Sequence, residues 1–193
     1  MKKNGGNQFL IAMQLTLGMR KLSMGELNRK SVDEYKQAEK LPVVVVLENI
    51  RSAYNVGSIF RTADAFLLAS IYICGYTAHP PHKEIKKTAL GAEETVDWKY
   101  FKNIGEAIQE IRGEGFKVYA VEQAENSRKL GSFTTDNKKV AVIFGNEVTG
   151  IEQSTIVLCD EVIEIPQLGI KHSLNVATAA GVVLWELIRR RIG

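Results

Sequence analysis

The chain has 193 residues, of which 45% are hydrophobic and 24% charged, with two cysteines and four prolines. This length and composition exclude wholesale disorder, a low-complexity chain and a multidomain assembly, and favour one domain with at most a small appendage. No window holds the ~20 apolar residues that a membrane span needs, and residues 9–17 are too weakly apolar for a signal peptide. With both cysteines interpreted as reduced small hydrophobes, these features predict a cytoplasmic protein.

The net charge of +3 is unevenly distributed. Residues 1–40 hold eight basic and four acidic side chains, a net of +4, whereas residues 41–193 hold 17 basic and 18 acidic ones, a net of −1. We therefore expect a basic, partly helical N-terminal extension at 1–40 before a domain at 41–193. Charge alone leaves two roles open for this extension, phosphate contacts with a polyanion or a solvated helix that keeps the protein soluble.

In chain order, the hydrophobic pattern alternates strands with helices after a segment, 1–8, that we expect to be mobile. The expected strands are 43–47, 71–75, 117–121, 140–144 and 162–165, and the expected helices are 22–39, 56–69, 103–112, 151–158 and 173–191, with a loop and a short helix over 77–92. Several strands are apolar on both faces, which is typical of strands covered by helices on both sides. The pattern predicts an α/β fold with a mainly parallel sheet and helices on both faces.

Ligands of such folds bind at the carboxyl ends of the strands, so the loops there are the candidate sites. The first, NIRSAYNVGSIFRTADAF at 49–66, places Asn55 and Gly57 at an expected helix start, where Asn is a good cap and Gly permits close approach. Arg61 lies within two turns of that start, and its spacing alone fits either a surface charge or a functional residue.

Two further loops follow later strands. FGNEVTG at 144–150 is a tight polar turn in which Glu147 can either orient a ligand or cap the next helix. IPQLGIKHSLNVATAA at 165–180 places Ser173 and Asn175 at the expected N-terminus of the last helix, where free N–H groups favour an N-cap or an anion.

Other ligand sites have weaker support. The loops lack a G-x-G-x-x-G fingerprint and a P-loop lysine, so neither dinucleotide binding nor an NTPase is predicted. His79 and His82 flank two prolines without an evident third ligand, so we expect no metal site. We interpret His172 as a loop residue near a substrate entrance.

The last expected helix, 173–191, is apolar almost all round, so it should be buried on all sides. A chain this small covers all faces of such a helix only with a second subunit. Ala177, Ala180 and Gly181 would permit close approach, so the sequence predicts a homodimer.

Taken together, the three loops resemble the motifs of the SpoU (TrmH-like) class of SPOUT RNA methyltransferases. The match runs from about Leu41 to Ile192, and its pieces are N-x-G-x-x-x-R at 55–61, F-G-x-E-x-x-G at 144–150, and I-P with S-L-N-V between 165 and 176. KTALGAEE at 87–94 is similar to the substrate-side loop of that family. Leu67 departs from the pattern, because the family usually has glycine there.

The resemblance implies a parallel sheet whose C-terminal part forms a deep trefoil knot (the SPOUT fold), a homodimer, and S-adenosylmethionine bound between the second and third motif loops. Carried over by position, the cofactor-binding residues are Phe144, Gly145, Asn146, Glu147, Ile165, Pro166, Gln167, Ser173, Leu174 and Asn175. No membrane partner and no metal are implied.

The implied reaction is methyl transfer to a ribose 2′-hydroxyl of tRNA or rRNA. The catalytic residues carried over are Arg61, Asn55, Glu147, Ser173 and Asn175. Arg61 matches an arginine often assigned as general base, although its permanent charge suits phosphate anchoring or alkoxide stabilisation better. Asn55 would position the ribose or Arg61, and Ser173 would touch the substrate.

RNA recognition would rest on basic residues of the extension and of the central segment. These are Arg20, Lys21, Arg29, Lys30, Arg51, Lys83, Lys86 and Lys87. Two alternatives stay open beside ribose methylation: methylation of an RNA base, and a catalytically silent RNA-binding protein on the same fold.

Overall fold

The computed structural model describes residues 20–134, 139–171 and 173–192. The chain divides into two units between Gln37 and Ala38, close to the boundary expected at residue 40. The expected mobile segment at 1–8 and His172 lie outside the described residues. Within the described part, no helix is long and apolar enough to cross a membrane.

The first unit has two short helices where the sequence predicts one helix over 22–39. They are η1 (Met24–Leu27) and α2 (Val32–Gln37). The prediction was wrong because Asn28 adopts a left-handed conformation with φ of 42° and ends η1. Ser31 then caps the N-terminus of α2, because its hydroxyl accepts a hydrogen bond from the backbone N–H of Glu34 at 3.2 Å.

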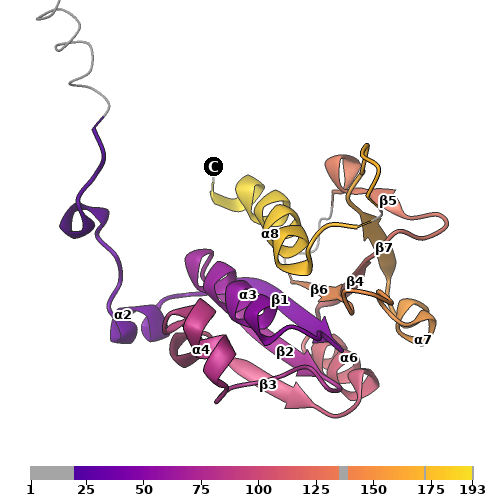
Figure 1. Cartoon of the computed structure of the whole chain (residues 1–193), viewed down its shortest axis with the longest axis horizontal. Coiled ribbons are helices and arrows are strands. Elements are labelled where there is room, and N and C mark those ends of the chain that lie inside the picture. Colours follow the sequence, from indigo (N-terminus) through magenta and orange to yellow (C-terminus); the bar gives the residue numbers. More distant parts are fainter. Residues whose placement is uncertain (1–19, 135–138, 172, 193) are drawn as a thin grey trace, which may run out of the picture. The chain divides into compact units, whose positions relative to one another are not determined.

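The second unit is built on seven strands in the order β3-β2-β1-β6-β4-β7-β5, and every pairing is parallel. Figure 1 shows this sheet. The strands are β1 (Leu41–Glu48), β2 (Leu68–Cys74), β3 (Trp98–Phe101), β4 (Lys117–Val121), β5 (Arg128–Lys129), β6 (Val140–Phe144) and β7 (Glu161–Glu164). The predicted α/β fold with a mainly parallel sheet is confirmed.

The hydrophobic pattern did not predict β3 and β5, which lie at the two edges of the sheet. The strand β3 reads WKYF and its residues are exposed or half-buried, so it lacks the apolar run that marks the central strands. The strand β5 has only two residues. Edge strands this short carry too little hydrophobic pattern to be recognised.

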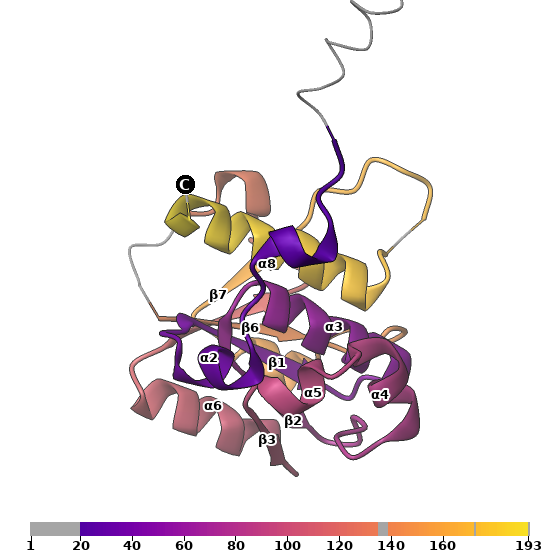
Figure 2. The same cartoon turned by 90° about the vertical axis from the view of Figure 1, so that its left-hand side faces the viewer.

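Helices cover both faces of the sheet, with α3, α4, α5 and α8 on one side and α6 on the other (Figure 2). Their bounds are α3 (Ala53–Ala65), α4 (Lys83–Ala89), α5 (Ala92–Thr95), α6 (Ile104–Gly113), α7 (Gln153–Ile156) and α8 (Val176–Ile192), and a short turn η2 spans Leu130–Ser132. The central strands are buried on both faces, as in Val43–Leu47, where exposure is 2% or less. Burial of such β-branched runs between helices stabilises the layered core.

The helix α3 differs from the expected range 56–69 at both ends. It begins at Ala53 because Ser52 is its cap: the Ser52 hydroxyl accepts a hydrogen bond from the Asn55 backbone N–H. Asn55 is therefore not the cap. The helix ends at Ala65, and Leu67 follows with a φ of 54°. That left-handed conformation favours glycine, which explains why a glycine is expected at this position of the resembled family.

Candidate active site

The motif loops meet where the strand order reverses. β1 and β6 are neighbours, with Leu47 opposite Phe144 near their carboxyl ends, and the chain continues from β1 toward β2 on one side while β4 lies on the other. A crevice at such a reversal is the usual ligand site of open α/β sheets. The loop after β1 leads into α3, and the loop after β6 carries Glu147.

The carboxylate of Glu147 joins these two loops. It accepts hydrogen bonds from the backbone N–H groups of Arg51 at 2.8 Å and Ser52 at 3.1 Å, and from the side-chain amide of Asn55 at 2.8 Å. Burial alone would raise the pKa of Glu147, but the hydrogen bonds from Arg51, Asn55 and Ser52 hold that pKa below its usual range. The residue is therefore an ionised carboxylate that binds the backbone just before α3, near the helix N-terminus, where negative charge is favoured.

Asn55 extends the connection to the third loop. Its side-chain oxygen accepts a hydrogen bond from the Asn175 amide at 3.1 Å. The Asn175 oxygen in turn accepts from the backbone N–H groups of Ala177 and Thr178 at 3.0 and 3.2 Å, so Asn175 caps α8. The sequence prediction that α8 begins at Ser173 was wrong, because Asn175 supplies this cap and Ser173 is in the preceding loop.

The loop after β6 folds into a tight turn. A Cβ on Gly145 would lie 2.4 Å from backbone atoms of Gly150 and Ile151, so only glycine fits there. The Asn146 and Gly150 backbones exchange hydrogen bonds of 3.1 and 2.9 Å, and the Asn146 side chain accepts from the N–H groups of Val148 and Thr149. This turn fixes the backbone next to Glu147.

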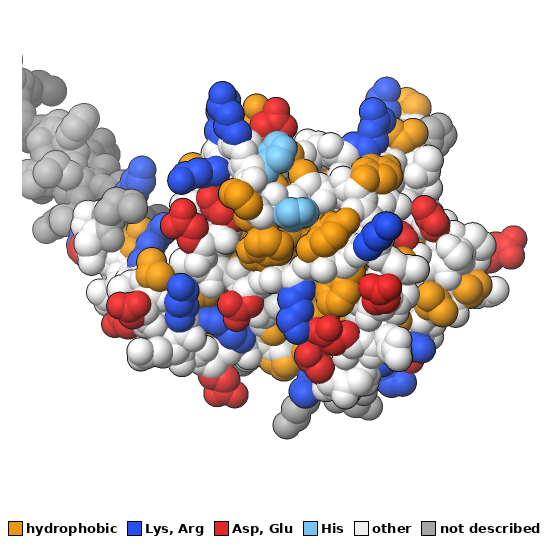
Figure 3. Space-filling model, turned by 90° about the horizontal axis from the view of Figure 1, so that it is seen from below, with side chains coloured by type: hydrophobic (Ala, Val, Ile, Leu, Met, Phe, Trp, Pro, Cys, Tyr) orange, Lys and Arg blue, Asp and Glu red, His pale blue; other side chains and the backbone are white. Residues whose placement is uncertain are grey.

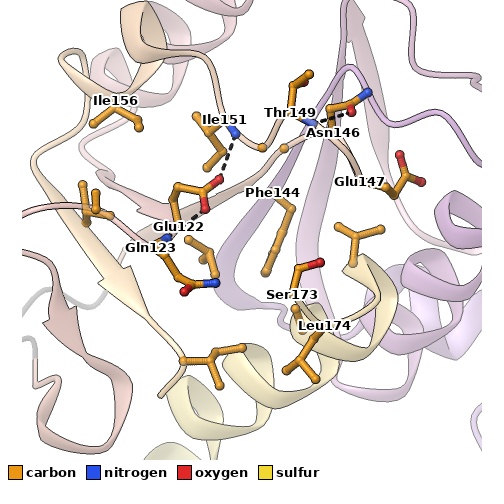
Figure 4. Close-up of a pocket in the computed structure, with 18 of the residues that line it drawn as sticks. Glu122, Gln123, Phe144, Asn146, Glu147, Thr149, Ile151, Ile156, Ser173 and Leu174 are labelled. Atoms are coloured by element: carbon orange, nitrogen blue, oxygen red, sulfur yellow. Dashed lines mark hydrogen bonds between the residues drawn. The ribbon is translucent and has the colours of Figure 1, made fainter. Parts of the chain in front are cut away.

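A cavity of about 730 Å³ opens beside the turn, between the loops after β4, β6 and β7 (Figure 4). Eight of the ten residues predicted to hold the cofactor line it, namely Phe144, Gly145, Asn146, Glu147, Ile165, Gln167, Ser173 and Leu174. Pro166 and Asn175 are not among the lining residues, and the Asn175 amide instead bonds Asn55. In Figure 4 the Phe144 ring points toward Ser173 and Leu174, whereas the Glu147 carboxylate points away from them.

Residues at the end of β4 also line the cavity and were not predicted from the sequence. Glu122 lines the cavity and accepts hydrogen bonds from the N–H groups of Ile151 at 3.0 Å and Gln123 at 2.8 Å. It thus ties the loop after β4 to the turn after β6. Gln123, Gln153 and Ile156 also line the cavity. The signal was available, because Glu122 directly follows the predicted strand 117–121.

Arg61 lies elsewhere on the same chain. It is exposed and lines a separate hollow of about 490 Å³ with Thr62, Phe66, Lys87 and Leu90, between α3 and α4. Arg61 is not among the residues that line the larger cavity. The structure of one chain therefore brings Asn55, Glu147 and Asn175 together but does not bring Arg61 to them.

The predicted RNA-binding residues are exposed in both units, each considered separately. They are Arg20, Lys21, Arg29, Lys30, Arg51, Lys83, Lys86 and Lys87. Arg20 is ion-paired with Glu26, and the pKa of Glu26 is lowered to about 2 by the Arg20 and Ser23 hydrogen bonds. Lys87 lies over the Tyr54 ring, 5.7 Å from its centre.

Comparison with known proteins decides the family. The model of the SpoU rRNA Methylase family matches residues 42–185. The chain belongs to the SpoU rRNA methylase family. Within the described residues, no group of His, Cys, Asp or Glu is arranged to hold a metal ion.

Two curated relatives of this SpoU protein illustrate the similarity. It is 31% identical to the tRNA (guanosine(18)-2'-O)-methyltransferase of Thermus thermophilus, over 86% of this chain and 84% of the relative. It is 27% identical to the 23S rRNA (guanosine-2'-O-)-methyltransferase RlmB of Vibrio vulnificus, over 86% of this chain and 67% of that one.

Solved structures agree. The AdoMet-bound rRNA methyltransferase from Sinorhizobium meliloti has a TM-score of 0.74 and 29% identity, over 86% of this chain and 62% of that one. The TrmH/SpoU tRNA modifying enzyme of A. aeolicus shares the fold, with a TM-score of 0.74 at 24% identity over 83% of this chain and 80% of that one. The prediction of an S-adenosylmethionine-dependent RNA 2′-O-ribose methyltransferase is confirmed.

Proposed function

We propose that this SpoU protein methylates the 2′-hydroxyl of a nucleotide in a folded tRNA or rRNA, in a site organised by Glu147, Asn55 and Asn175. The observation that carries this proposal is the continuous hydrogen-bond chain from Glu147 through Asn55 to Asn175, which joins all three motif loops. Two of the curated relatives are guanosine 2′-O-methyltransferases, so guanosine is the first nucleotide to test.

The cavity fits S-adenosylmethionine in size and chemistry. Its volume of about 730 Å³ lies in the range of small-molecule sites. Phe144, Ile156 and Leu174 offer apolar surface for an adenine, and Glu122 and Gln123 offer polar groups for its sugar and amino-acid parts. When bound, the cofactor would supply a methyl group on a sulfonium, which makes its sulfur a good leaving group without a protein acid.

The chain's own residues would act by positioning. Asn55, held from two sides by Glu147 and Asn175, keeps its side chain in one orientation next to the cavity. Such fixed placement of reacting groups accounts for much of the rate in transfer reactions. Arg61 would contribute a permanent positive charge to a phosphate or to the alkoxide that forms as the hydroxyl loses its proton.

We infer that the working form is a homodimer. Val182 and Trp185 of α8 are 41% and 50% exposed, and a Cβ on Gly181 would meet nothing within 4 Å. Large apolar side chains beside such an open backbone are typical of a surface that another subunit covers. In a homodimer, Arg61 of one subunit could reach the cavity of the other subunit, although it does not line the cavity of its own chain.

The remaining parts of the proposal follow from the family. We expect the C-terminal segment after β6 to pass through a loop and form the trefoil knot, and we expect the protein to act in the cytoplasm. We also propose that Ser173, which lines the cavity, contacts the substrate.

Replacement of Arg61 tests the proposal. Arg61→Ala should abolish methyl transfer from S-adenosylmethionine to RNA prepared from cells that lack this protein, while calorimetry shows unchanged cofactor binding. The matched control is Arg112→Ala, because Arg112 is exposed on α6 and bonds Leu158 and Asp160. Unchanged turnover by Arg61→Ala would refute the role of Arg61, and a wild-type protein without cofactor affinity would support a silent RNA binder.

A further inference from the structure

Three aromatic rings pack together at the edge of the sheet, and a fourth ring lies between them and the turn after β6, on residues that the catalytic motifs do not include. His79 stacks against Trp98 with 5.7 Å between ring centres and an interplanar angle of 24°, and it lies 4.9 Å from the Tyr100 ring. Trp98 and Tyr100 are two residues apart on β3 and so share one face of that strand. The fourth ring, Tyr76, belongs to the loop after β2.

Hydrogen bonds connect these rings to the catalytic loop. The Tyr100 hydroxyl donates to the carbonyl oxygen of Gly75 at 3.0 Å, next to Tyr76 in the chain. The Tyr76 hydroxyl accepts from the side-chain amide of Asn146 at 2.7 Å, and Asn146 precedes Glu147. We call Tyr76, His79, Trp98 and Tyr100 the aromatic track. It runs from the turn after β6 to the sheet edge.

The aromatic track is open to solvent. Tyr76 is 64% exposed and Tyr100 44% exposed, His79 is exposed and Trp98 is half-buried. On the opposite face of β3, Phe101 stacks on the buried Tyr72 at 5.0 Å and belongs to the packing around α6. The core therefore uses one face of β3. On the other face the loop that holds His79 packs against Trp98 and Tyr100 and leaves part of the aromatic surface exposed.

Lysines flank the track, with acidic residues among them. Lys83 and Lys86 line a hollow of about 330 Å³ next to His79, together with Pro80, Pro81, His82, Glu93 and Glu94. Lys102 directly follows β3 and is exposed. Figure 3 looks onto this face, where the two described histidines (pale blue) lie against hydrophobic side chains, with both basic (blue) and acidic (red) side chains nearby. Glu94 offsets part of this charge, since it lies 3.9 Å from Lys86.

We propose that the aromatic track binds unpaired nucleotides of the RNA substrate by base stacking, on the side of the site away from the cofactor cavity. Exposed rings interleaved with lysines fit single-stranded RNA, because bases stack on the rings while phosphates contact the cations. The track begins beside Asn146, so nucleotides adjacent to the methylated one would occupy it. This inference rests on the proposed function, since it names where that substrate is held.

Fluorescence tests stacking independently of activity. The chain has two tryptophans, so Trp185→Phe leaves Trp98 as the only one. In that background, a short oligouridylate should quench Trp98 fluorescence, whereas an abasic ribose-phosphate oligomer of equal length should not. Equal quenching by both oligomers would overturn the proposal, because it would show that charge and not stacking governs the contact.

Kinetics test the same surface in the enzyme. The double variant His79→Ala/Tyr100→Ala should raise the KM for RNA about tenfold or more, as expected for the loss of a stacked base. Its kcat and its affinity for S-adenosylmethionine should stay within about twofold of the wild type. The control His79→Phe/Tyr100→Phe keeps both rings and should keep the KM.

The failures of the two proposals are distinguishable. A wild-type protein that methylates no RNA refutes the proposed function, and the fluorescence experiment then still decides whether bases stack on Trp98. An active double variant with an unchanged KM refutes the aromatic track alone. A double variant whose oligomeric mass changes while its KM does not would assign the surface to contact with a second copy.

Discussion

Glu147 and Asn55, 92 residues apart in the chain, are joined by a 2.8 Å hydrogen bond between carboxylate and amide. Glu147 also accepts hydrogen bonds from the backbone N–H groups of Arg51 and Ser52, just before α3. The carboxylate thus fixes both the start of the helix and the side chain that projects from its first turn. The predictions for Asn55 and Glu147 depend on this coupling.

Asn55→Ala should lower kcat about 100-fold, the scale of loss that follows when a positioning group is removed from an aligned site. The physical reason is that Glu147 and Asn175 each lose a partner, so the three loops are no longer held together. The measurement is steady-state methyl transfer to RNA. Asn103→Ala is the matched control, because Asn103 caps α6 by accepting from Gly105, and an equal loss there would contradict a specific role for Asn55.

Glu147→Gln should change how stability depends on pH. The pKa of Glu147 is lowered in the folded protein by its hydrogen bonds, against the effect of burial. A lowered carboxyl pKa contributes stability above the unfolded value of about 4.3, and that contribution disappears as pH falls through the folded pKa. The Tm difference between wild type and variant should therefore be largest near neutral pH and shrink below about pH 4.

Glu48 provides a control, because its pKa is shifted in the direction opposite to that of Glu147. It is 3% exposed, and burial raises its pKa although Thr155 and the Glu152 N–H donate hydrogen bonds to it. A raised carboxyl pKa contributes stability at low pH that is lost as pH rises through the folded value. The Tm of wild type relative to Glu48→Gln should therefore rise on acidification. Parallel pH profiles for the two variants would contradict both assignments.

Gly145→Ala should destabilise the turn after β6 and weaken cofactor binding. The added Cβ would meet backbone atoms of Gly150 and Ile151 at 2.4 Å, and backbone gives way less easily than a side chain. Thermal unfolding and calorimetry with S-adenosylmethionine measure the effect. Gly169→Ala is the control, because a Cβ there meets nothing within 4 Å. Equal cofactor affinity for both variants would show that the turn does not shape the cavity.

The meeting of the three motif loops was predictable from the sequence, because parallel strands bring their carboxyl ends to one edge. The partners within the site were not. Asn55 is a good cap by residue type, yet Ser52 takes that role and frees Asn55 to face Glu147 and Asn175. That outcome depends on where the helix starts, and pattern alone leaves helix ends uncertain by a few residues.

The position of Arg61 was predictable along the chain but not in space. Its place on α3 follows from the helical pattern, whereas the hollow that it lines depends on how α3 packs against α4. Gly57 permits that packing: a Cβ there would lie 2.5 Å from the Ile85 carbonyl oxygen of α4. Close approach at Gly57 was predictable from the residue type, but its partner was not, because a local pattern does not encode long-range packing.

The proposed homodimer makes a prediction about α8. Trp185→Glu should shift the protein toward monomer, because it places a charge on the half-exposed apolar surface that the second copy would cover. Light scattering after gel filtration measures the mass. Val157→Glu is the control, since Val157 is 70% exposed and follows α7. A monomeric wild type, or equal shifts for both variants, would contradict the proposed interface.

Affinity for RNA should fall linearly on a log–log plot as salt concentration rises, because each phosphate contact releases counterions. Lys83→Ala and Lys87→Ala should each reduce the slope by about one if each lysine contacts one phosphate. Lys117→Ala is the control, because Lys117 is ion-paired with Asp160 at 3.0 Å and its loss should leave the slope unchanged. A wild-type affinity for RNA that is insensitive to salt would contradict phosphate recognition by these lysines. A steep slope that neither variant changes would instead assign the phosphate contacts to other cations. The extension that contains Arg29 and Lys30 would then be the next to test.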